Sequence, residues 1–181
     1  MSSLSNPSRA PRNRLLCKAE RGIGGRGMTG VLANQQIEAL MAEGVIAADT
    51  PFVEGQVQPA SLDLRLGAVA YRVRASFLAG TGKRVEDRLS DFEMHRIPLE
   101  GGAVLEKGCV YLVPLMERLS LPDGISAVAN AKSSTGRLDL LTRTITDGGT
   151  EFDRIADGYA GPLYAEICPR SFSVLVRPGM R

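Results

Sequence analysis

Residues 132–168 read KSSTGRLDLLTRTITDGGTEFDRIADGYAGPLYAEIC. Two segments of this stretch, 140–146 and 163–168, have the length and apolar content of β-strands. The pair Gly148-Gly149 lies between them and marks a turn. The stretch therefore predicts two strands joined by a polar connection.

The same pattern extends outward from this stretch along most of the chain. Leu62, Leu64 and Leu66 alternate with Asp63 and Arg65, which predicts a strand with one buried face and places the two charged residues on its exposed face. Turn signals rich in Gly and Pro separate the other strand candidates. These candidates are residues 71–74, 103–105, 109–114, 125–130 and 172–176.

One short helix precedes these strands. Asn34 is a good N-cap, Ile37 and Leu40 fall on one face, and Gly44 can end the helix. Residues 79–93 are charged and contain Gly, which predicts a loop. Many short strands with a single leading helix are typical of an all-β sandwich or barrel.

Composition is consistent with one globular domain and excludes several classes of protein. The chain has 181 residues and is 44% hydrophobic, and no apolar run is long enough to cross a bilayer. Three widely spaced Cys and a single His do not form a zinc-binding pattern. Unpaired cysteines favour a reducing compartment, so we expect a cytoplasmic protein.

The first 27 residues differ from the remainder. They hold six basic residues and one acidic residue, and they are rich in Ser, Gly and Pro. Such a segment buries too little apolar area to offset chain entropy, so we expect a disordered basic tail at 1–27 and a folded domain at 28–181. The tail is interpreted as a solvated extension, or as residues upstream of a start at Met28, rather than as a nucleic-acid-binding arm.

Two features of the 132–168 stretch carry chemistry. Ser133 and Ser134 lie between Lys132 and Arg137, and hydroxyls flanked by cations suit an anionic ligand, although a solvated turn has the same composition. Glu166 is a carboxylate within an apolar run, where burial is costly unless it has a function. A Glu facing solvent is the alternative.

Several separated motifs occur in one order along the chain: the early segment 58–67, the basic-Ser-Ser-x-x-Arg-Leu block at 132–138, the Gly-aromatic-x-Gly turn at 158–161, Glu166 and the late turn 177–180. Taken together, they resemble the dCTP deaminases of the trimeric dUTPase-like superfamily. The likeness extends from about Val31 to the last residue and is greatest for the N-terminal half of the long two-domain bacterial form.

The resemblance implies a distorted jelly roll, or dUTPase-like β-barrel, which assembles as a trimer or pseudo-trimer. It implies deamination of dCTP to dUTP and ammonia, which supplies dUTP for dTTP synthesis, with Mg²⁺ bound through the triphosphate and no zinc. Glu166 is then the general acid/base, and Arg137 and Ser133 lie around the base and the catalytic water. Lys132 and Ser134 would contact the phosphates, and Arg154 and Tyr159 would lie near the base pocket.

Two departures from the family pattern keep alternatives open. The family has an Asp where this chain has Ala156, and Asp157 lies one position later, where a side chain points the other way. This disfavours the chief alternative, a dUTP pyrophosphatase, and leaves open a non-catalytic nucleotide-binding or oligomerisation half. The chain stops at Arg181, just past a turn that leads into another strand, so an unpaired sheet edge is expected.

Overall fold

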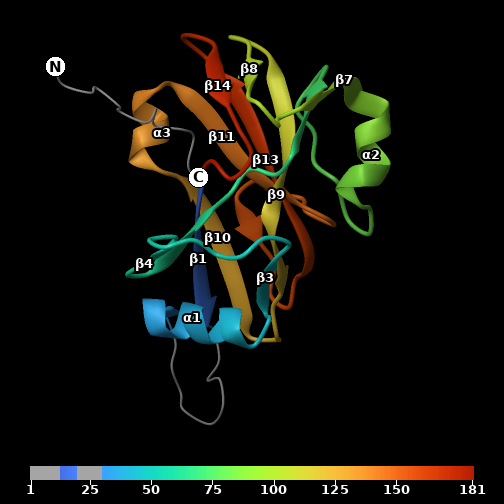
Figure 1. Cartoon of the computed structure of the whole chain (residues 1–181). Helices are drawn as coiled ribbons and strands as arrows, with labels where there is room; N and C mark the ends of the chain where they lie inside the picture. Colours follow the sequence, from blue (N-terminus) through green and yellow to red (C-terminus); the bar gives the residue numbers. More distant parts are fainter. Residues whose placement is uncertain (1–12, 20–29) are drawn as a thin grey trace, which may run out of the picture.

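Two antiparallel sheets and a small third one make up most of the molecule (Figure 1). The computed structural model describes residues 13–19 and 30–181. The first sheet has the strand order β12-β10-β1-β5-β4, with β2 beside β1. Its strands are β1 (Asn13–Ala19), β2 (Gly30–Val31), β4 (Val57–Gln58), β5 (Ser61–Leu64), β10 (Ile125–Ala131) and β12 (Arg154–Ile155).

The second sheet has the order β11-β13-β9-β6-β7, with β3 beside β9, and β8 pairs with β14 separately. These strands are β3 (Ile46–Ala48), β6 (Val69–Val73), β7 (Glu93–Pro98), β8 (Ala103–Leu105), β9 (Val110–Ser120), β11 (Leu140–Thr146), β13 (Ala160–Pro169) and β14 (Val174–Val176). The described helices are α1 (Asn34–Ala42), α2 (Val85–Phe92) and α3 (Ser133–Arg137). The predicted mainly β fold is confirmed.

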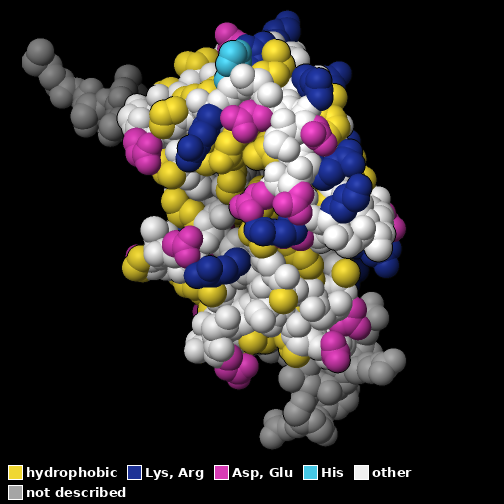
Figure 2. Space-filling view, turned by 90° about the vertical axis from the view of Figure 1, so that its right-hand side faces the viewer, with side chains coloured by type: hydrophobic (Ala, Val, Ile, Leu, Met, Phe, Trp, Pro, Cys, Tyr) yellow, Lys and Arg dark blue, Asp and Glu magenta, His cyan; other side chains and the backbone are white. Residues whose placement is uncertain are grey.

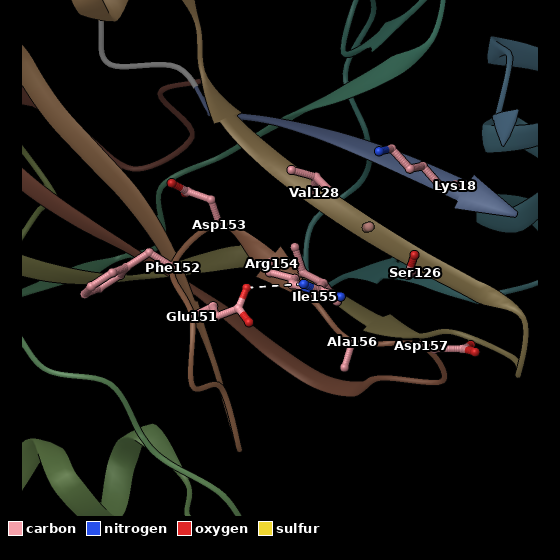
Figure 3. Close-up of a pocket in the computed structure, with 11 residues that line it drawn as sticks. Lys18, Ser126, Val128, Glu151, Phe152, Asp153, Arg154, Ile155, Ala156 and Asp157 are labelled. Carbon is pink, nitrogen blue, oxygen red and sulfur yellow. Dashed lines mark hydrogen bonds and ion pairs between the residues drawn. The ribbon is translucent and has the colours of Figure 1, made fainter. Parts of the chain in front are cut away.

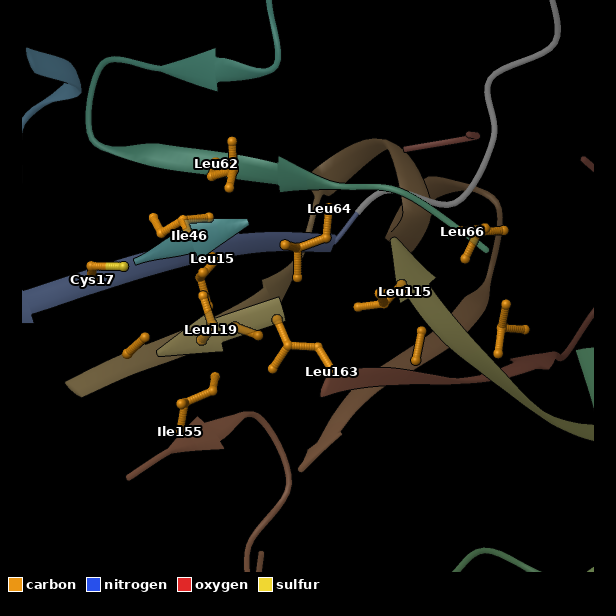
Figure 4. Close-up of a cluster of buried hydrophobic side chains, with 14 of the residues drawn as sticks. Leu15, Cys17, Ile46, Leu62, Leu64, Leu66, Leu115, Leu119, Ile155 and Leu163 are labelled. Atoms are coloured by element: carbon orange, nitrogen blue, oxygen red, sulfur yellow. The ribbon is translucent and has the colours of Figure 1, made fainter. Parts of the chain in front are cut away.

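The main apolar core lies between the two large sheets. Leu15 and Leu62 enter it from the first sheet, and Leu119 and Leu163 enter it from the second (Figure 4). All four side chains are at most 3% exposed. Burying a side chain of this size stabilises the fold by about 1.5–3 kcal/mol, so this core holds the sheets together.

A second apolar cluster covers the opposite face of the β11-β13-β9 sheet. Tyr164 and Leu112 point into it from the sheet, while Val85 and Leu89 of α2 and Phe77 pack over them. Figure 1 shows α2 on this outer side, away from β1 and β10. Side chains on β13 therefore alternate between two buried environments.

The expectation of a disordered tail at 1–27 is wrong for residues 13–19. These residues form β1, which lies between β10 and β5 and pairs with both. Leu15, Cys17 and Ala19 are each at most 3% exposed, so the strand contributes directly to the core. The rest of that segment, 1–12 and 20–27, lies outside the described residues.

The helices also differ from the expectation of a single helix. Residues 79–93 were predicted to be a loop, but Val85–Phe92 form α2, which buries Val85 and Leu89 against the sheet. Asn34 is the first helical residue of α1 rather than its N-cap, and Ala33 holds the cap position. The Ala33 N–H donates to the Gln36 side chain at 2.8 Å, so the side chain from the first turn stabilises this end.

The placement of Asp63 and Arg65 on an exposed strand face is wrong. Both are buried, at 1% and 3% exposure. Arg65 forms an ion pair with Glu117, with 2.7 Å between Nε and Oε1, and its other nitrogens donate to the carbonyls of Thr50 and Pro51. Alternation therefore located the strand correctly, but its polar face lies against protein rather than water.

The C-terminal turn lies beside the residues that follow β5. Asn13 of β1 lies opposite Leu64, and Met180 bonds to Leu66 two residues further along the same edge. β1 therefore pairs with β5, and the C-terminal turn bonds to the residues that follow β5.

Candidate functional site

The segment that follows β10 forms the short helix α3. Lys132 occupies its N-cap position, and Arg137 is its last residue. The side chains of Ser133 and Arg137 are exposed. The side chain of Ser134 lies outside the described part of the chain. The predicted cluster of hydroxyls and cations, Lys132 to Arg137, therefore lies on one short helix and its N-cap.

Lys132 has a buried acidic partner. Its Nζ lies 3.2 Å from Oδ2 of Asp63, and Nε of Arg14 lies 3.4 Å from the other carboxylate oxygen. Asp63 is 1% exposed, whereas Lys132 is 16% and Arg14 37% exposed. The two cations compensate a buried charge and stand together at the surface beside α3.

A hollow of about 550 Å³ lies between β10 and the connection that contains β12 (Figure 3). It is lined by Lys18, residues 126–128 and residues 151–157. Arg154 lies in it and forms an ion pair with Glu151 at 3.3 Å, and both side chains are more than 60% exposed. A hollow of this size suits a small-molecule ligand.

A smaller hollow of about 140 Å³ adjoins the first one and shares Glu151, Arg154 and Ala156 with it. Tyr159 lines this smaller hollow and is fixed by two hydrogen bonds: its O–H donates to the Pro162 carbonyl at 2.6 Å and accepts from the Asp147 N–H at 3.2 Å. Burial raises the pKa of Tyr159 to about 12. The ring therefore forms a rigid, neutral wall.

Asp157 stabilises the turn that precedes Tyr159. Its Oδ1 accepts a hydrogen bond from the Gly124 N–H at 2.6 Å. Gly158 follows with a φ of +66°, a left-handed conformation that glycine adopts without strain. A carboxylate engaged in this way has a structural role, which agrees with treating Asp157 as no substitute for the family Asp at position 156.

Glu166 lies in the middle of β13, between Arg143 on β11 and Leu112 on β9. It is 3% exposed, which excludes the alternative of a Glu that faces solvent. Its Oε1 accepts from the Arg143 Nε at 3.0 Å and from a second guanidinium nitrogen at 2.5 Å. Glu166 is thus a buried carboxylate with a cationic partner.

Sequence reasoning missed three residues around Glu166: Arg143, Phe152 and Asp153. The Arg143 guanidinium stacks 3.8 Å from the centre of the Phe152 ring. Burial raises the pKa of Asp153, and the nearby Glu166 charge acts in the same direction, whereas the Thr144 N–H and the Arg143 charge oppose it. The only signal for Arg143 was its position on a predicted strand, opposite another predicted strand.

The predicted site residues fall into three groups in one chain. Lys132, Ser133 and Arg137 lie at α3, Arg154 and Tyr159 lie at the hollows, and Glu166 lies beneath Arg143. Phe152 and Asp153 connect the last two groups, because they line the larger hollow and also interact with Arg143. No hydrogen bond or ion pair between described residues joins Glu166 to the three α3 residues.

Neither a one-sign charge patch on the face seen in Figure 2 nor a metal-binding cluster or membrane-spanning helix among the described residues points to another kind of site. On the side of the molecule where α2 lies, basic and acidic side chains are interspersed (Figure 2). Within residues 13–19 and 30–181, no three His, Cys, Asp or Glu side chains cluster so as to hold a metal ion. No helix in this part of the chain is long and apolar enough to span a membrane.

The structure is thus a two-sheet β domain with a buried carboxylate and a hollow of a size that suits a small molecule. Residues 28–181 match the family model described as the 2′-deoxycytidine 5′-triphosphate deaminase N-terminal domain. The chain therefore belongs to the dCTP deaminase family, as its sequence motifs indicated.

Several proteins to which this chain is similar are named as dCTP deaminases. A dCTP deaminase of Haloarcula marismortui is 32% identical over 128 residues, which cover 70% of this chain and 63% of that protein. A "dCTP deaminase, dUMP-forming" of Beutenbergia cavernae is 30% identical over 152 residues, covering 83% and 75%. The crystal structure of 2′-deoxycytidine 5′-triphosphate deaminase from Agrobacterium tumefaciens matches with a TM-score of 0.80 and 58% identity. That match covers 82% of this chain and 44% of the solved chain, so the matched part corresponds to less than half of that protein.

Proposed function

We propose that this protein deaminates dCTP to dUTP and ammonia, with Glu166 as the general acid/base. The observation that carries the proposal is the burial of Glu166, at 3% exposure, against a guanidinium that itself packs on Phe152 in the wall of the larger hollow. A carboxyl group removed from water in this way is costly, and such groups concentrate at active sites.

The chemistry requires one group that moves protons in sequence. Glu166 takes a proton from the water that attacks C4 of the cytosine ring and delivers it to N3. It then takes the proton of the new C4 hydroxyl and transfers it to the amino group, so that the C4 carbonyl forms as the C4–N bond breaks, water is consumed and ammonia is released. Only one His and three scattered Cys are present in the chain, so we assign this task to a carboxyl group rather than to zinc-bound water.

The triphosphate is assigned to α3. Lys132 and Ser134 are assigned to the phosphates, with Arg14 beside Lys132 as a second cation. Ser133 and Arg137, which are exposed on the same turn, are assigned to the base and the catalytic water. Phosphate oxygens suit hydroxyl and cationic donors. The segment 132–137 contains no carboxylate, so a Mg²⁺ ion at the triphosphate would take its ligands from phosphate and water.

We further propose that the protein self-associates, as a trimer or pseudo-trimer, and acts in the cytoplasm. Support comes from the resemblance and from the lack, among described residues, of a hydrogen bond or ion pair that joins Glu166 to Lys132, Ser133 or Arg137 in one chain. A site between copies would combine α3 of one copy with β13 of another.

Product analysis tests the reaction. Incubation with dCTP and Mg²⁺ is expected to release ammonia and dUTP in equal amounts. Pyrophosphate from dUTP without ammonia from dCTP would instead establish the dUTP pyrophosphatase. Nucleotide binding without any product would indicate the non-catalytic half. Ammonia with dUMP and pyrophosphate would identify a dUMP-forming reaction, which the name of the Beutenbergia relative brings into consideration.

A further inference from the structure

We infer that Arg143 is a positioning residue for Glu166, and that it determines which carboxylate oxygen carries the transferred proton. The inference rests on the proposed deamination. Arg143 lies directly opposite Glu166 in the β11–β13 register, so the contact is built into the sheet. Two guanidinium nitrogens donate to the same oxygen, Oε1, at 3.0 and 2.5 Å.

The guanidinium is itself held in place by two other residues. One of its terminal nitrogens donates to Oγ of Ser76 at 3.0 Å. Its plane lies over the Phe152 ring at 3.8 Å, within the range of a cation–π contact. The Arg143 side chain is 29% exposed, so most of it is packed against protein. Its guanidinium group donates to both Ser76 and Glu166. A fixed guanidinium fixes the carboxylate that it binds.

The asymmetry of the contact has a chemical consequence. Two N–H donors of a positively charged group occupy the lone pairs of Oε1, and the guanidinium accepts no hydrogen bond, so protonation of Oε1 is disfavoured relative to Oε2 while Arg143 is bound. Oε2 takes part in neither contact with Arg143. The exchangeable proton of Glu166 is therefore directed to Oε2, the oxygen that must face the attacking water and the ring.

Asp153 is a second carboxylate in the neighbourhood of Arg143. Its Oδ1 accepts from the Thr144 N–H at 2.7 Å, and it lies close enough to Arg143 and Glu166 for their charges to affect its pKa. Arg143 thus has two carboxylates near it, Asp153 and the fully buried Glu166. Without it they would repel each other, and Glu166 would lose its fixed orientation.

The test uses Arg143→Lys, which keeps the charge but loses the planar fork, and Arg143→Ala. Arg72→Lys is the matched control, because Arg72 is 33% exposed and pairs with Glu106 at 3.1 Å on the same sheet. We expect kcat for ammonia release to fall about 10- to 100-fold in Arg143→Lys, with KM for dCTP changed by less than about 3-fold. Added guanidinium ion, below denaturing concentration, should restore part of the kcat of Arg143→Ala.

Several results would overturn the inference. Wild-type kcat in a folded Arg143→Lys variant, or an equal loss in Arg72→Lys, removes the positioning role. A rise in KM at constant kcat assigns Arg143 to substrate binding instead.

If Arg143→Ala does not fold, Arg143→Lys and Phe152→Leu test the inference. Phe152→Leu removes the ring that packs on the guanidinium, so it should also lower kcat. A wild-type protein that releases no ammonia contradicts the proposed function itself, and the positioning role with it.

Discussion

Two buried glutamates in this molecule each have an arginine partner, and their surroundings give them different roles. Glu117 accepts from Arg65 on both oxygens, and the Gln56 amide donates to it as well. Glu166 is bonded by Arg143 through Oε1 alone. A carboxylate whose two oxygens are both occupied stabilises structure, whereas one with an oxygen to spare can take part in proton transfer.

Glu117→Gln tests this distinction at the residue scale. The substitution leaves the buried Arg65 guanidinium without its counter-charge, so we expect the free energy of unfolding to fall by about 3–5 kcal/mol. Urea denaturation measures the loss. The activity of the fraction that remains folded should be unchanged, and a stability within 1 kcal/mol or so of the wild type would contradict a structural role for Glu117.

At the scale of elements, β1 is the least expected part of the fold. It lies between β10 and β5, yet it falls outside the residues matched by the family model. Leu15, Cys17 and Ala19 alternate toward the core, and Arg14 adds a charge to the buried Asp63. The strand is therefore integral to both the core and the surface beside α3.

Thiol labelling tests the position of β1. Cys17 is 1% exposed, and burial raises the pKa of its thiol to about 11, whereas Cys109 is only half-buried. We expect Cys109 to react with iodoacetamide at pH 8 and Cys17 to react only as the protein unfolds. Mass spectrometry of labelled peptides gives the two rates. Equal rates in the native protein would show that β1 is not held in the sheet.

The sign of the pH effect at Cys17 follows from its raised pKa. The neutral thiol is favoured in the folded state, so its contribution to stability is fully present below about pH 8.5–9. That contribution is lost as the pH rises through about 11. Labelling at higher pH should therefore shorten the protection of Cys17.

Some elements could be predicted from the sequence because local pattern determines them. The strands at 103–105 and 140–146 have the predicted bounds. By contrast, β1 has only short apolar alternation within an Arg- and Gly-rich segment, and its partners are supplied by residues 62–64 and 125–131. Helix α2 was missed because Gly80, Gly82 and many charges indicated a loop, although Val85 and Leu89 have helical spacing.

At the scale of the whole molecule, the site is only partly encoded in local motifs. The motif around Glu166 identified a candidate carboxyl, but its partner Arg143 lies 23 positions away and meets it through strand register. Register depends on packing of both sheet faces, which one sequence does not display. The same limit applies to Asp63, whose burial requires cations from β1 and from the start of α3.

Complementation tests whether sites form between copies. Arg137→Ala and Glu166→Gln should each be inactive alone, because one lacks the α3 cation and the other lacks the acid/base. Co-expression with two different tags, followed by purification of mixed assemblies, should restore ammonia release, since some sites then combine intact α3 and intact β13. Mixed assemblies that stay inactive would contradict a site shared between copies.

The most direct measurement of the central claim compares ammonia release from dCTP by the wild type and by Glu166→Gln, with nucleotide affinity measured in parallel. The account predicts a loss in kcat of about 10²–10⁴-fold, with dCTP binding retained, because the amide replaces the carboxyl without emptying its place. Glu117→Gln serves as the control for a buried glutamate outside the reaction. Ammonia release by Glu166→Gln at the wild-type rate would contradict the account.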